Sequence, residues 1–370
     1  MTCSRAIGVE IRALKPVMKR KSKVIVAMSG GVDSSVSAAL LLDQGFDVSG
    51  VSLRMWEGER GPRVCSDHRG AAEVAAHLGI PHQLLDLRRE FAETVVQPFA
   101  KDYLRGRTPN PCVACNRDFK LGTLLRWAKA HDADYVATGH YARIVHDESK
   151  PQAALLRGAD RNKDQSYFLF ALSREQLAGT LFPLGAMQKR DVRDNARRLG
   201  LPAAERPESQ DICFGDYKRL VASYAQEGEL GGGEVVDRAG NRLGRHRGVH
   251  TVTVGQRRGL GISASEALYV VDIDERSKRV VVGNKEALGC SGLIARSVNW
   301  LEPPGDIEIS AEVQVRYRAP AVPCTVKARA DGTCEVRAVD RFVAVTPGQA
   351  AVFYRGDQLL GGGWIVSAIR

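Results

Sequence analysis

Residues 23–35 read KVIVAMSGGVDSS, and this stretch decides the fold. Its first part, 23–28, is a short apolar run that ends in a glycine-rich turn, which is typical of a buried strand. The apolar segment 34–44 follows at once and predicts a helix that Gly45 ends. A strand joined to a helix by such a tight turn is the opening unit of an α/β domain.

The alternation of strand and helix continues outward from this turn. Further strands are predicted at 47–53, 81–87 and 133–138, and a second helix at 69–78. This order indicates a parallel sheet with helices on both faces, which is a doubly wound α/β fold. Ligands of such sheets bind at the carboxyl ends of the strands. We therefore expect the site at the glycine-rich turn and at the turn formed by Gly139 and His140.

The second half of the chain has a different pattern. Residues 227–233, EGELGGG, are the best candidate linker, and helical periodicity fades beyond them. Short β-branched runs separated by turn residues then predict two small β domains, the last a β-barrel. These runs lie at 234–236, 268–273, 279–282, 307–317, 322–328, 335–339 and 350–354. The expected segments are a basic tail (1–22), an α/β domain (23–226), a central β domain (227–288) and a barrel (289–370).

Composition narrows the class of partner and the compartment. The chain holds 53 Lys+Arg against 43 Asp+Glu, and this net charge of +10 favours a polyanionic partner. No run approaches the ~18 uncharged apolar residues of a membrane span. The first 22 residues are interpreted as a disordered basic tail or as an organelle-targeting peptide. Eight cysteines without a secretion signal favour a reducing compartment, and we expect the cytoplasm.

The turn SGGVDSS at 29–35 is suited to bind phosphate. Its glycines let backbone N–H groups point inward, the helix N-terminus adds partial positive charge, and Ser29, Ser34 and Ser35 add donors. It is neither the Walker sequence nor the dinucleotide fingerprint, and without a ligand it would be an ordinary strand-to-helix turn. The signature SGGxDS resembles the pyrophosphate-loop ATPases, which cleave ATP between the α and β phosphates. That resemblance implies adenylation of a carbonyl oxygen but leaves the substrate open.

The cysteines form a second candidate site. Cys112 and Cys115 make a C-x-x-C, and Cys213 lies far along the chain. Three thiolates suit a [4Fe-4S] cluster with one iron left open. A sulfur relay with Cys112 as a spare thiol is an alternative, and a structural zinc site would need another ligand. No catalytic role is expected for the others, which are Cys3, Cys65, Cys290, Cys324 and Cys334.

Six motifs together resemble the bacterial and mitochondrial tRNA 2-thiouridylases, the MnmA type. They occur in that family's order and cover almost everything from Lys23 to Arg370. Two of them lie in the β-rich half, which other pyrophosphate-loop enzymes lack. The motifs are TPNPxxxCN (108–116), ATGHYAR (137–143), NKDQSYFL (162–169), SQxICF (209–214), VGQRRGLGI (254–262) and QVRYR (314–318).

The resemblance implies an ATP- and Mg²⁺-dependent enzyme that thiolates C2 of the wobble uridine in the tRNA anticodon loop. It implies release of AMP and pyrophosphate, and a sulfur donor that is sulfide or a persulfide-carrying protein. The implied ATP site is Ala27, Met28, Ser29, Gly30, Gly31, Val32, Asp33, Ser34, Leu53 and Gly139. The implied RNA contacts are Asn110, Pro111 and Cys112 at the target base, with Lys163, Asp164, Gln165, Arg316 and Tyr317.

The resemblance also gives the cysteines roles, with one departure. Cys115 matches the attacking cysteine, and Cys213 matches the carrier of a persulfide. Many members of the family have Asp where this chain has Cys112. The implied chemistry is sound, because the C2 oxygen of uridine is a poor leaving group, whereas after adenylation it departs as part of AMP. A thiolate or persulfide is then a suitable soft nucleophile.

Basic side chains outside these motifs are further candidates for RNA contact. Lys189, Arg190, Arg193, Arg197 and Arg198 predict a phosphate-binding helix face, or else a plain solvated one. The loop 256–259 offers arginines beside glycine, which suits RNA approach but also a tight hairpin. His140 is expected to bind phosphate or to close its turn.

Two other functions are compatible with parts of the sequence. A pyrophosphate-loop synthetase acting on a small molecule would leave the C-x-x-C, Cys213 and the basic β half unexplained. A tRNA-binding protein without catalysis would not need the intact loop or both family cysteines.

Overall fold

The computed structural model describes residues 21–56, 67–145, 153–208, 213, 215–302, 304 and 308–370. Nearly all of the predicted basic tail lies outside these residues, as do Cys3 and Cys65. Within the described ranges, no helix combines the length and the apolar character needed to cross a bilayer.

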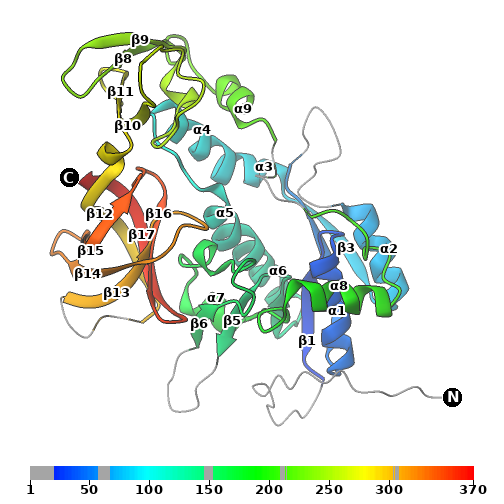
Figure 1. Cartoon of the computed structure of the whole chain (residues 1–370). Helices are drawn as coiled ribbons and strands as arrows, with labels where there is room; N and C mark the ends of the chain where they lie inside the picture. The colour runs from blue at the N-terminus through cyan, green and yellow to red at the C-terminus, as the bar shows by residue number, and fades with distance from the viewer. Residues whose placement is uncertain are drawn as a thin grey trace.

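A five-stranded parallel sheet organises the first half of the chain, in the order β3-β2-β1-β4-β7 (Figure 1). It contains all four predicted strands, and β1 lies at the centre between β2 and β4. The strands are β1 (Lys23–Ala27), β2 (Asp47–Arg54), β3 (His82–Asp86), β4 (Tyr135–Ala137) and β7 (Thr180–Leu181). The two residues of β7 are too few to give a periodic signal, so this strand was not predicted.

Helices cover both faces of this sheet. Val24 and Val26 of β1 pack with α1 (Val32–Asp43) and α2 (His68–Leu78). Ile25 points to the opposite face, because neighbouring side chains of a strand alternate, and it packs there with α4 (Gln97–Leu104) and α6 (Leu124–Ala130). The doubly wound α/β prediction is therefore confirmed (Figure 1).

A helix interrupted by π-helical turns carries the C-x-x-C. Helix α5 (Pro111–Ala114) continues into the π-helix η2 (Cys115–Thr123) and then into α6. Wide π-helical turns are uncommon and frequently lie at functional sites. The other helices of the described residues are α3 (Arg88–Phe91), η1 (Ala92–Val96), η3 (Ser166–Phe168), α7 (Arg174–Ala178), α8 (Lys189–Arg198), α9 (Tyr217–Ser223), η4 (Val249–Thr251) and η5 (Glu286–Leu288).

The second half consists of two β structures, as predicted. A four-stranded sheet has the order β10-β11-β8-β9, and a closed six-stranded barrel follows it, in which β12 pairs with both β15 and β17. The sheet strands are β8 (Gly233–Val236), β9 (Arg242–His246), β10 (Tyr269–Asp274) and β11 (Arg279–Gly283). The barrel strands are β12 (Gly289–Trp300), β13 (Glu308–Gln314), β14 (Val322–Ala328), β15 (Cys334–Val343), β16 (Ala350–Arg355) and β17 (Gln358–Ile369). The exact domain limits stay a prediction.

The two longest barrel strands, β12 and β17, were not predicted. Glycines 361–363 interrupt the β pattern of β17, since a glycine run usually signals a turn. In the fold these glycines face β12: a Cβ on Gly363 would lie 2.9 Å from the carbonyl oxygen of Arg296, and one on Gly361 would collide with the Asn299 carbonyl. The close approach of the two strands that close the barrel therefore requires glycine.

A hairpin of the first half joins the barrel sheet. Strands β5 (Ala142–Val145) and β6 (Ala154–Arg157) pair with each other, and β6 pairs with β17. The backbone N–H of Arg157 donates to the carbonyl of Asp357 at 2.9 Å, and the Arg143 guanidinium lies 2.6 Å from the Asp357 carboxylate. The barrel is thus anchored directly on the α/β half, beside the segment 162–169.

Candidate active site

The glycine-rich turn between β1 and α1 is ordered by hydrogen bonds from its own residues. Gly30 has φ of 78°, in the left-handed region that glycine adopts without strain. The Ser34 and Ser35 hydroxyls donate to the carbonyl of Gly31 at 3.1 and 2.9 Å, and the backbone N–H of Ser29 donates to Ser34 Oγ at 3.2 Å. Gly31 caps α1 without a side chain, so the first amides of the helix face the carboxyl edge of the sheet.

Arg206 supports this turn from outside. Its guanidinium donates to the Gly30 carbonyl at 3.0 Å and to the Asp67 carboxylate at 2.7 Å. Asp67 in turn donates its backbone N–H to the Ser29 carbonyl at 2.9 Å. The turn is therefore fixed by a residue more than 170 positions away in the sequence, and no local pattern marks Arg206 for this role.

Gly139, at the end of β4, lies directly against the loop. A Cβ at this position would lie 2.9 Å from the backbone of Asp33 and from the amide nitrogen of Ser34. The structure thus brings together the two turns that the sequence singled out, at the carboxyl edge of the sheet. Glycine is needed here for close packing and not for an unusual backbone angle.

The loop aspartate is held by two residues from other elements. The Lys189 ammonium lies 2.7 and 2.8 Å from the two oxygens of the Asp33 carboxylate, and the Tyr141 hydroxyl donates to the same carboxylate at 2.7 Å. Lys189 is 9% exposed, so the prediction that it contacts RNA on an open helix face is wrong. Lys189 lies at the first position of α8, and helical periodicity did not show that this end points inward.

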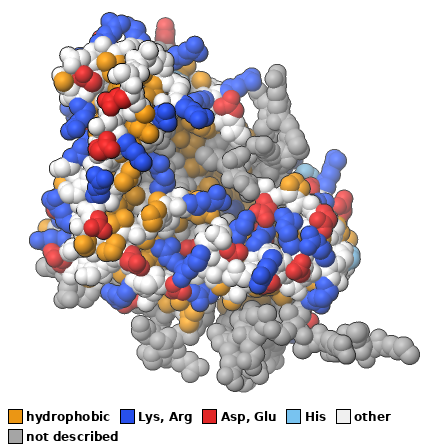
Figure 2. Space-filling model, viewed as in Figure 1, with side chains coloured by type: hydrophobic (Ala, Val, Ile, Leu, Met, Phe, Trp, Pro, Cys, Tyr) orange, Lys and Arg blue, Asp and Glu red, His pale blue; other side chains and the backbone are white. Residues whose placement is uncertain are grey.

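The other basic residues of α8 are largely neutralised by protein groups. Arg193 donates to the Ala204 carbonyl at 3.1 Å, and Arg197 pairs with Glu205 at 2.8 Å. Arg190 and Arg198 stay at the surface. On the face shown in Figure 2, Lys and Arg side chains are spread over both halves of the molecule with acidic side chains among them. The net charge is therefore not concentrated in one patch on that face.

The C-x-x-C lies at the same sheet edge as the loop. Asn110 caps α5 by accepting from the Cys112 amide at 3.2 Å, and Cys115 begins η2. The Cys115 thiol lies 3.9 Å from the sulfur of Met55, which directly follows β2. Because β2 is the neighbour of β1, the thiol and the phosphate loop both lie at the carboxyl ends of adjacent strands.

Both thiols are protonated at neutral pH in this state. Burial raises the pKa of Cys112 to about 11, and the nearby Cys115 adds to the rise. Burial also raises the pKa of Cys115, which is 6% exposed, while the Lys120 ammonium opposes the rise. Lys120 is a cation near both sulfurs, and no sequence motif marks it. It lies five residues after Cys115 in η2, a spacing that an ordinary helical pattern does not bring to one face.

Cys213 packs against the hydrophobic cluster that contains Cys115. It is disulfide-bonded, whereas Cys112 and Cys115 are both free, so neither is its partner. Across the described ranges, no three His, Cys, Asp or Glu side chains are gathered as a metal-binding group. As placed, the three cysteines therefore do not fit the ligand set of a cluster.

Leu53 lies on β2 and is 5% exposed within the main core. It was expected on the adenine side of the nucleotide. Trp56 packs partly against the same core. Between Leu53 and Trp56 lies Met55, whose sulfur contacts the Cys115 thiol of the C-x-x-C. The residue that reaches the thiol is therefore Met55, directly after β2, and no sequence motif marks it.

His140 closes its turn from a buried position. Its Nδ1 shares a hydrogen bond of 2.7 Å with the Thr138 hydroxyl, and the residue is 8% exposed. Burial, with the nearby Lys120 charge, lowers its pKa to about 3. The imidazole is therefore neutral at physiological pH and supplies no positive charge to a phosphate.

This buried histidine makes stability depend on pH. Below pH ~6.5 the unfolded chain binds a proton on this imidazole, whereas the folded chain binds it only near pH 3. The contribution of His140 to stability is therefore fully present above pH ~6.5 and is lost as the pH falls. We expect this group to cost about 2 kcal/mol of unfolding free energy at pH 5 relative to pH 7. Urea denaturation of the wild type and of His140→Gln at both pH values measures it. Equal pH sensitivity of the two proteins would contradict it.

The segment 163–165 lies between the loop network and the barrel. Lys163 extends to Glu208 at 2.6 Å, and Gln165 accepts from the Tyr141 amide at 3.0 Å. The Asp164 carboxylate accepts from the amides of Gly158 and Ser166 at 2.9 and 3.0 Å. The Lys163 side chain is 30% exposed, whereas that of Asp164 is 9% exposed.

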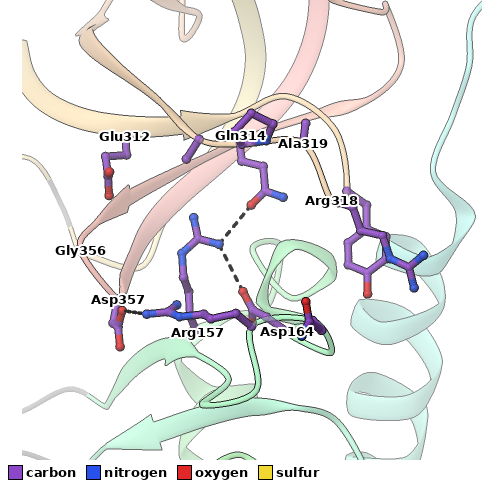
Figure 3. A pocket seen from close by; sticks show the side chains of 13 residues that line it. Arg157, Asp164, Glu312, Gln314, Arg318, Ala319, Gly356 and Asp357 are labelled. Carbon is purple, nitrogen blue, oxygen red and sulfur yellow. Dashed lines mark hydrogen bonds and ion pairs between the residues drawn. The ribbon is translucent and has the colours of Figure 1, made fainter.

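A cavity of about 640 Å³ opens where this segment meets the barrel (Figure 3). Arg157 lies across it, donating at 3.2 Å to both Asp164 and Gln314. Its guanidinium carbon lies 3.4 Å from the centre of the Tyr354 ring. Arg318 stands on the far wall of the cavity, next to Tyr317. The cavity thus joins two of the segments that were predicted to contact RNA.

Arg316 joins the central β domain to the barrel. Its guanidinium donates to the carbonyls of Val254 and Ala344, each at 3.3 Å, and to the Thr346 hydroxyl at 2.9 Å. Val254 begins the motif VGQRRGLGI, whose Arg257 and Arg258 are exposed. Arg316 therefore holds the motif that begins at Val254 and the barrel together through protein contacts.

Comparisons with known proteins agree with this arrangement. Residues 22–216 match the tRNA methyl transferase HUP domain, 220–284 the tRNA methyl transferase PRC-barrel domain, and 290–365 the aminomethyltransferase beta-barrel domain. The chain is 51% identical to the tRNA-specific 2-thiouridylase MnmA of Syntrophotalea carbinolica, over 94% of this chain and 100% of that protein. It is 47% identical to the enzyme of the same name from Geotalea uraniireducens, over 95% and 96%.

A more distant likeness is to the solved structure of the U34-tRNA thiolase NcsA from Methanococcus maripaludis with its [4Fe-4S] cluster. The TM-score is 0.34 at 20% identity, over 56% of this chain and 66% of that one. This likeness is too low to transfer a ligand. The identities over nearly full length, with three domains matched in order, show that the chain belongs to the family of tRNA-specific 2-thiouridylases.

Proposed function

We propose that this protein uses ATP to thiolate C2 of the wobble uridine in tRNA, releasing AMP and pyrophosphate. One observation carries the proposal: the Cys115 thiol touches Met55 after β2, while the phosphate loop follows the adjacent β1. A group that adenylates and a group that handles sulfur therefore share one edge of one sheet. A small-molecule synthetase would need the first but not the second.

The phosphate loop serves the adenylation step. Amides at the start of α1 would bind the phosphates, and departure of pyrophosphate builds up negative charge that these donors stabilise. Asp33 is the one carboxylate among residues 27–35, and it would hold Mg²⁺ together with phosphate oxygens. Bound Mg²⁺ supplies neutralisation of charge on the leaving pyrophosphate.

We propose a two-cysteine route for the sulfur step. A persulfide on Cys213 attacks C2, AMP leaves, and the uridine is joined to Cys213 through two sulfurs. The Cys115 thiolate then attacks the Cys213 sulfur, which releases 2-thiouridine and leaves a Cys115–Cys213 disulfide. A thiol reductant restores the pair, and the donor reloads Cys213. The route requires the two sulfurs to come together during the reaction; Cys213 packs against the same large core cluster that contains Cys115.

The competing form is a [4Fe-4S] cluster on Cys112, Cys115 and Cys213. Both routes require reduction of the Cys213 disulfide, but the cluster also requires Cys213 to join two thiols with which it is not gathered. We therefore route no step through a cluster. In the two-cysteine route the sulfur donor is a persulfide-carrying protein, because loading the Cys213 thiol from sulfide would need an oxidant; sulfide would be the donor only in the cluster form. We also propose a cytoplasmic location.

The test is nucleoside mass spectrometry of unmodified tRNA incubated with Mg²⁺ and ATP. One arm supplies a persulfide donor without iron, and the other supplies sulfide after anaerobic iron–sulfur reconstitution. We expect 2-thiouridine in the first arm. Product confined to the reconstituted arm would replace the two-cysteine route by the cluster, and no product in either arm would overturn the proposed function.

Arg316 gives a further prediction about RNA binding. Because its guanidinium contacts protein acceptors, Arg316→Ala should weaken tRNA affinity about tenfold without changing the slope of log K against log salt. Arg318 is exposed on the same turn, and Arg318→Ala is the control expected to lower the slope by about one unit. Filter binding between low and moderate salt measures both. A reduced slope for Arg316→Ala would show that it contacts a phosphate directly.

A further inference from the structure

Four charged side chains of alternating sign run from the phosphate loop to the segment 163–165. Lys189 lies 2.7 Å from Asp33 and 3.3 Å from Glu208, and Glu208 lies 2.6 Å from Lys163. We call Asp33, Lys189, Glu208 and Lys163 the charge chain. Its two ends belong to the candidate ATP loop and to a candidate RNA contact.

The charge chain is shielded from solvent along its middle. The Lys189 and Glu208 side chains are 11% and 21% exposed, whereas the end members Asp33 and Lys163 are 33% and 30% exposed. Buried pairs are screened little by salt, and loss of one partner leaves a costly unpaired charge. Loss of a partner at one end of the charge chain therefore changes the electrostatic energy of the next member.

Lys189 has two acidic partners that compete for it. It now sits closer to Asp33 than to Glu208, while its own backbone is fixed because its amide donates to Asp160 at 3.0 Å. Glu208 is shared among Lys163, Lys189 and Arg193, the last at 3.3 Å. Its closest partner is Lys163, whose side chain is 30% exposed and can therefore be contacted by an RNA phosphate.

An RNA phosphate that takes the Lys163 ammonium removes the closest cation from Glu208. Glu208 then attracts Lys189 more strongly, and Lys189 moves its charge away from Asp33. Asp33 keeps its hydrogen bond from Tyr141, so its carboxylate stays in place while it loses a competing cation. It is then free to serve the Mg²⁺–ATP complex.

We propose that the charge chain transmits tRNA binding at Lys163 to the ATP loop, with Lys189 as a positioning residue for Asp33. The proposal rests on the proposed function, because it needs a phosphate at Lys163 and a nucleotide at the loop. It predicts reciprocal coupling: tRNA tightens nucleotide binding, and the nucleotide tightens tRNA binding by the same factor.

Calorimetry with Mg²⁺ and α,β-methylene ATP, which cannot be cleaved between the α and β phosphates, measures this coupling. For the wild type we expect unmodified tRNA to tighten nucleotide binding about tenfold. Glu208→Gln should reduce that factor below about twofold, because an amide no longer attracts Lys189. Glu205→Gln is the matched control: Glu205 lies in the same segment but pairs with Arg197, outside the charge chain, and should keep the wild-type factor.

Lys163→Met separates coupling from a merely structural role. Without tRNA, this variant should bind the nucleotide about as tightly as the tRNA-bound wild type does, since its Glu208 is already released. Lys189→Arg should retain part of the coupling and Lys189→Met none. Should Glu208→Gln not fold, which circular dichroism would show, Lys163→Met still tests the idea.

The outcomes are distinct. A wild-type factor near one, an unchanged factor in Glu208→Gln, or an unchanged nucleotide affinity in Lys163→Met each overturns the charge chain as a coupling device. Thiolation by the wild type with tRNA bound, but without coupling, would defeat this inference alone. Absence of tRNA binding and of 2-thiouridine would instead defeat the proposed function.

Discussion

Gly139→Ala will slow ATP cleavage by about a hundredfold. A reacting group that is displaced by up to about one ångström loses about that much in rate. The added Cβ would lie 2.9 Å from the backbone of Asp33 and Ser34, which form the first turn of α1. Backbone at a helix start cannot yield as a flexible side chain can. AMP release in the presence of tRNA, followed by chromatography, measures the effect.

Gly231→Ala is the matched control for this change. Its Cβ would meet neighbours no closer than 3.4 Å, and it lies in the linker before the central β domain. We expect wild-type turnover from Gly231→Ala and a loss of stability of about 1–3 kcal/mol from Gly139→Ala. A Gly139→Ala protein with normal turnover would show that the loop moves away without cost and does not need its observed position.

The second large effect concerns the two thiols of the C-x-x-C. Cys115→Ser should lower 2-thiouridine formation about a thousandfold or more, since a hydroxyl cannot resolve a disulfide-linked intermediate. Cys112→Asp should keep formation within about tenfold, because the two-cysteine route does not use the Cys112 sulfur. Single-turnover incubations with a persulfide donor, analysed by nucleoside mass spectrometry, compare the variants.

The comparison of these two variants distinguishes the sulfur routes. Loss of product in Cys112→Asp as complete as in Cys115→Ser would contradict the two-cysteine route and favour three thiolate ligands. Cys324→Ser serves as the control, because that thiol is buried in the barrel core, remote from the sheet edge. Product from Cys324→Ser should equal that of the wild type.

The sheet that positions the site could be predicted from sequence because its signals are local. The strands β1, β2 and β4 and the helices α1 and α2 each bury a continuous or periodic apolar run, ended by glycine or a turn. The edge strand β3 was predicted from its sequence pattern although none of its residues is buried. The strand expected at 307–317 ends instead at Gln314, since Arg318 adopts a left-handed backbone with φ of 64°. Strand β17 was missed because its glycines serve contact with β12 and not a turn.

The site could be predicted only in part, because much of it depends on contacts between distant segments. The loop and Gly139 were identified from motifs, and they do lie together. The contacts of Arg206, Tyr141 and Lys189 with the loop join residues 108 to 176 positions apart, and no periodic pattern encodes such contacts. Lys189 illustrates the limit: its sequence neighbours suggest a basic surface, yet its side chain is buried against Asp33.

The pairing of β6 with β17 has a consequence for synthesis on the ribosome. Strand β6 ends at Arg157, and its partner begins about 200 residues later, at Gln358. Because the barrel closes through β12 and β17, the hairpin beside segment 162–169 acquires its neighbour only after residues 358–369 have left the exit tunnel. A nascent chain can therefore form the turn between β1 and α1 early, but the β6–β17 pairing beside that segment forms only after β17 has been made.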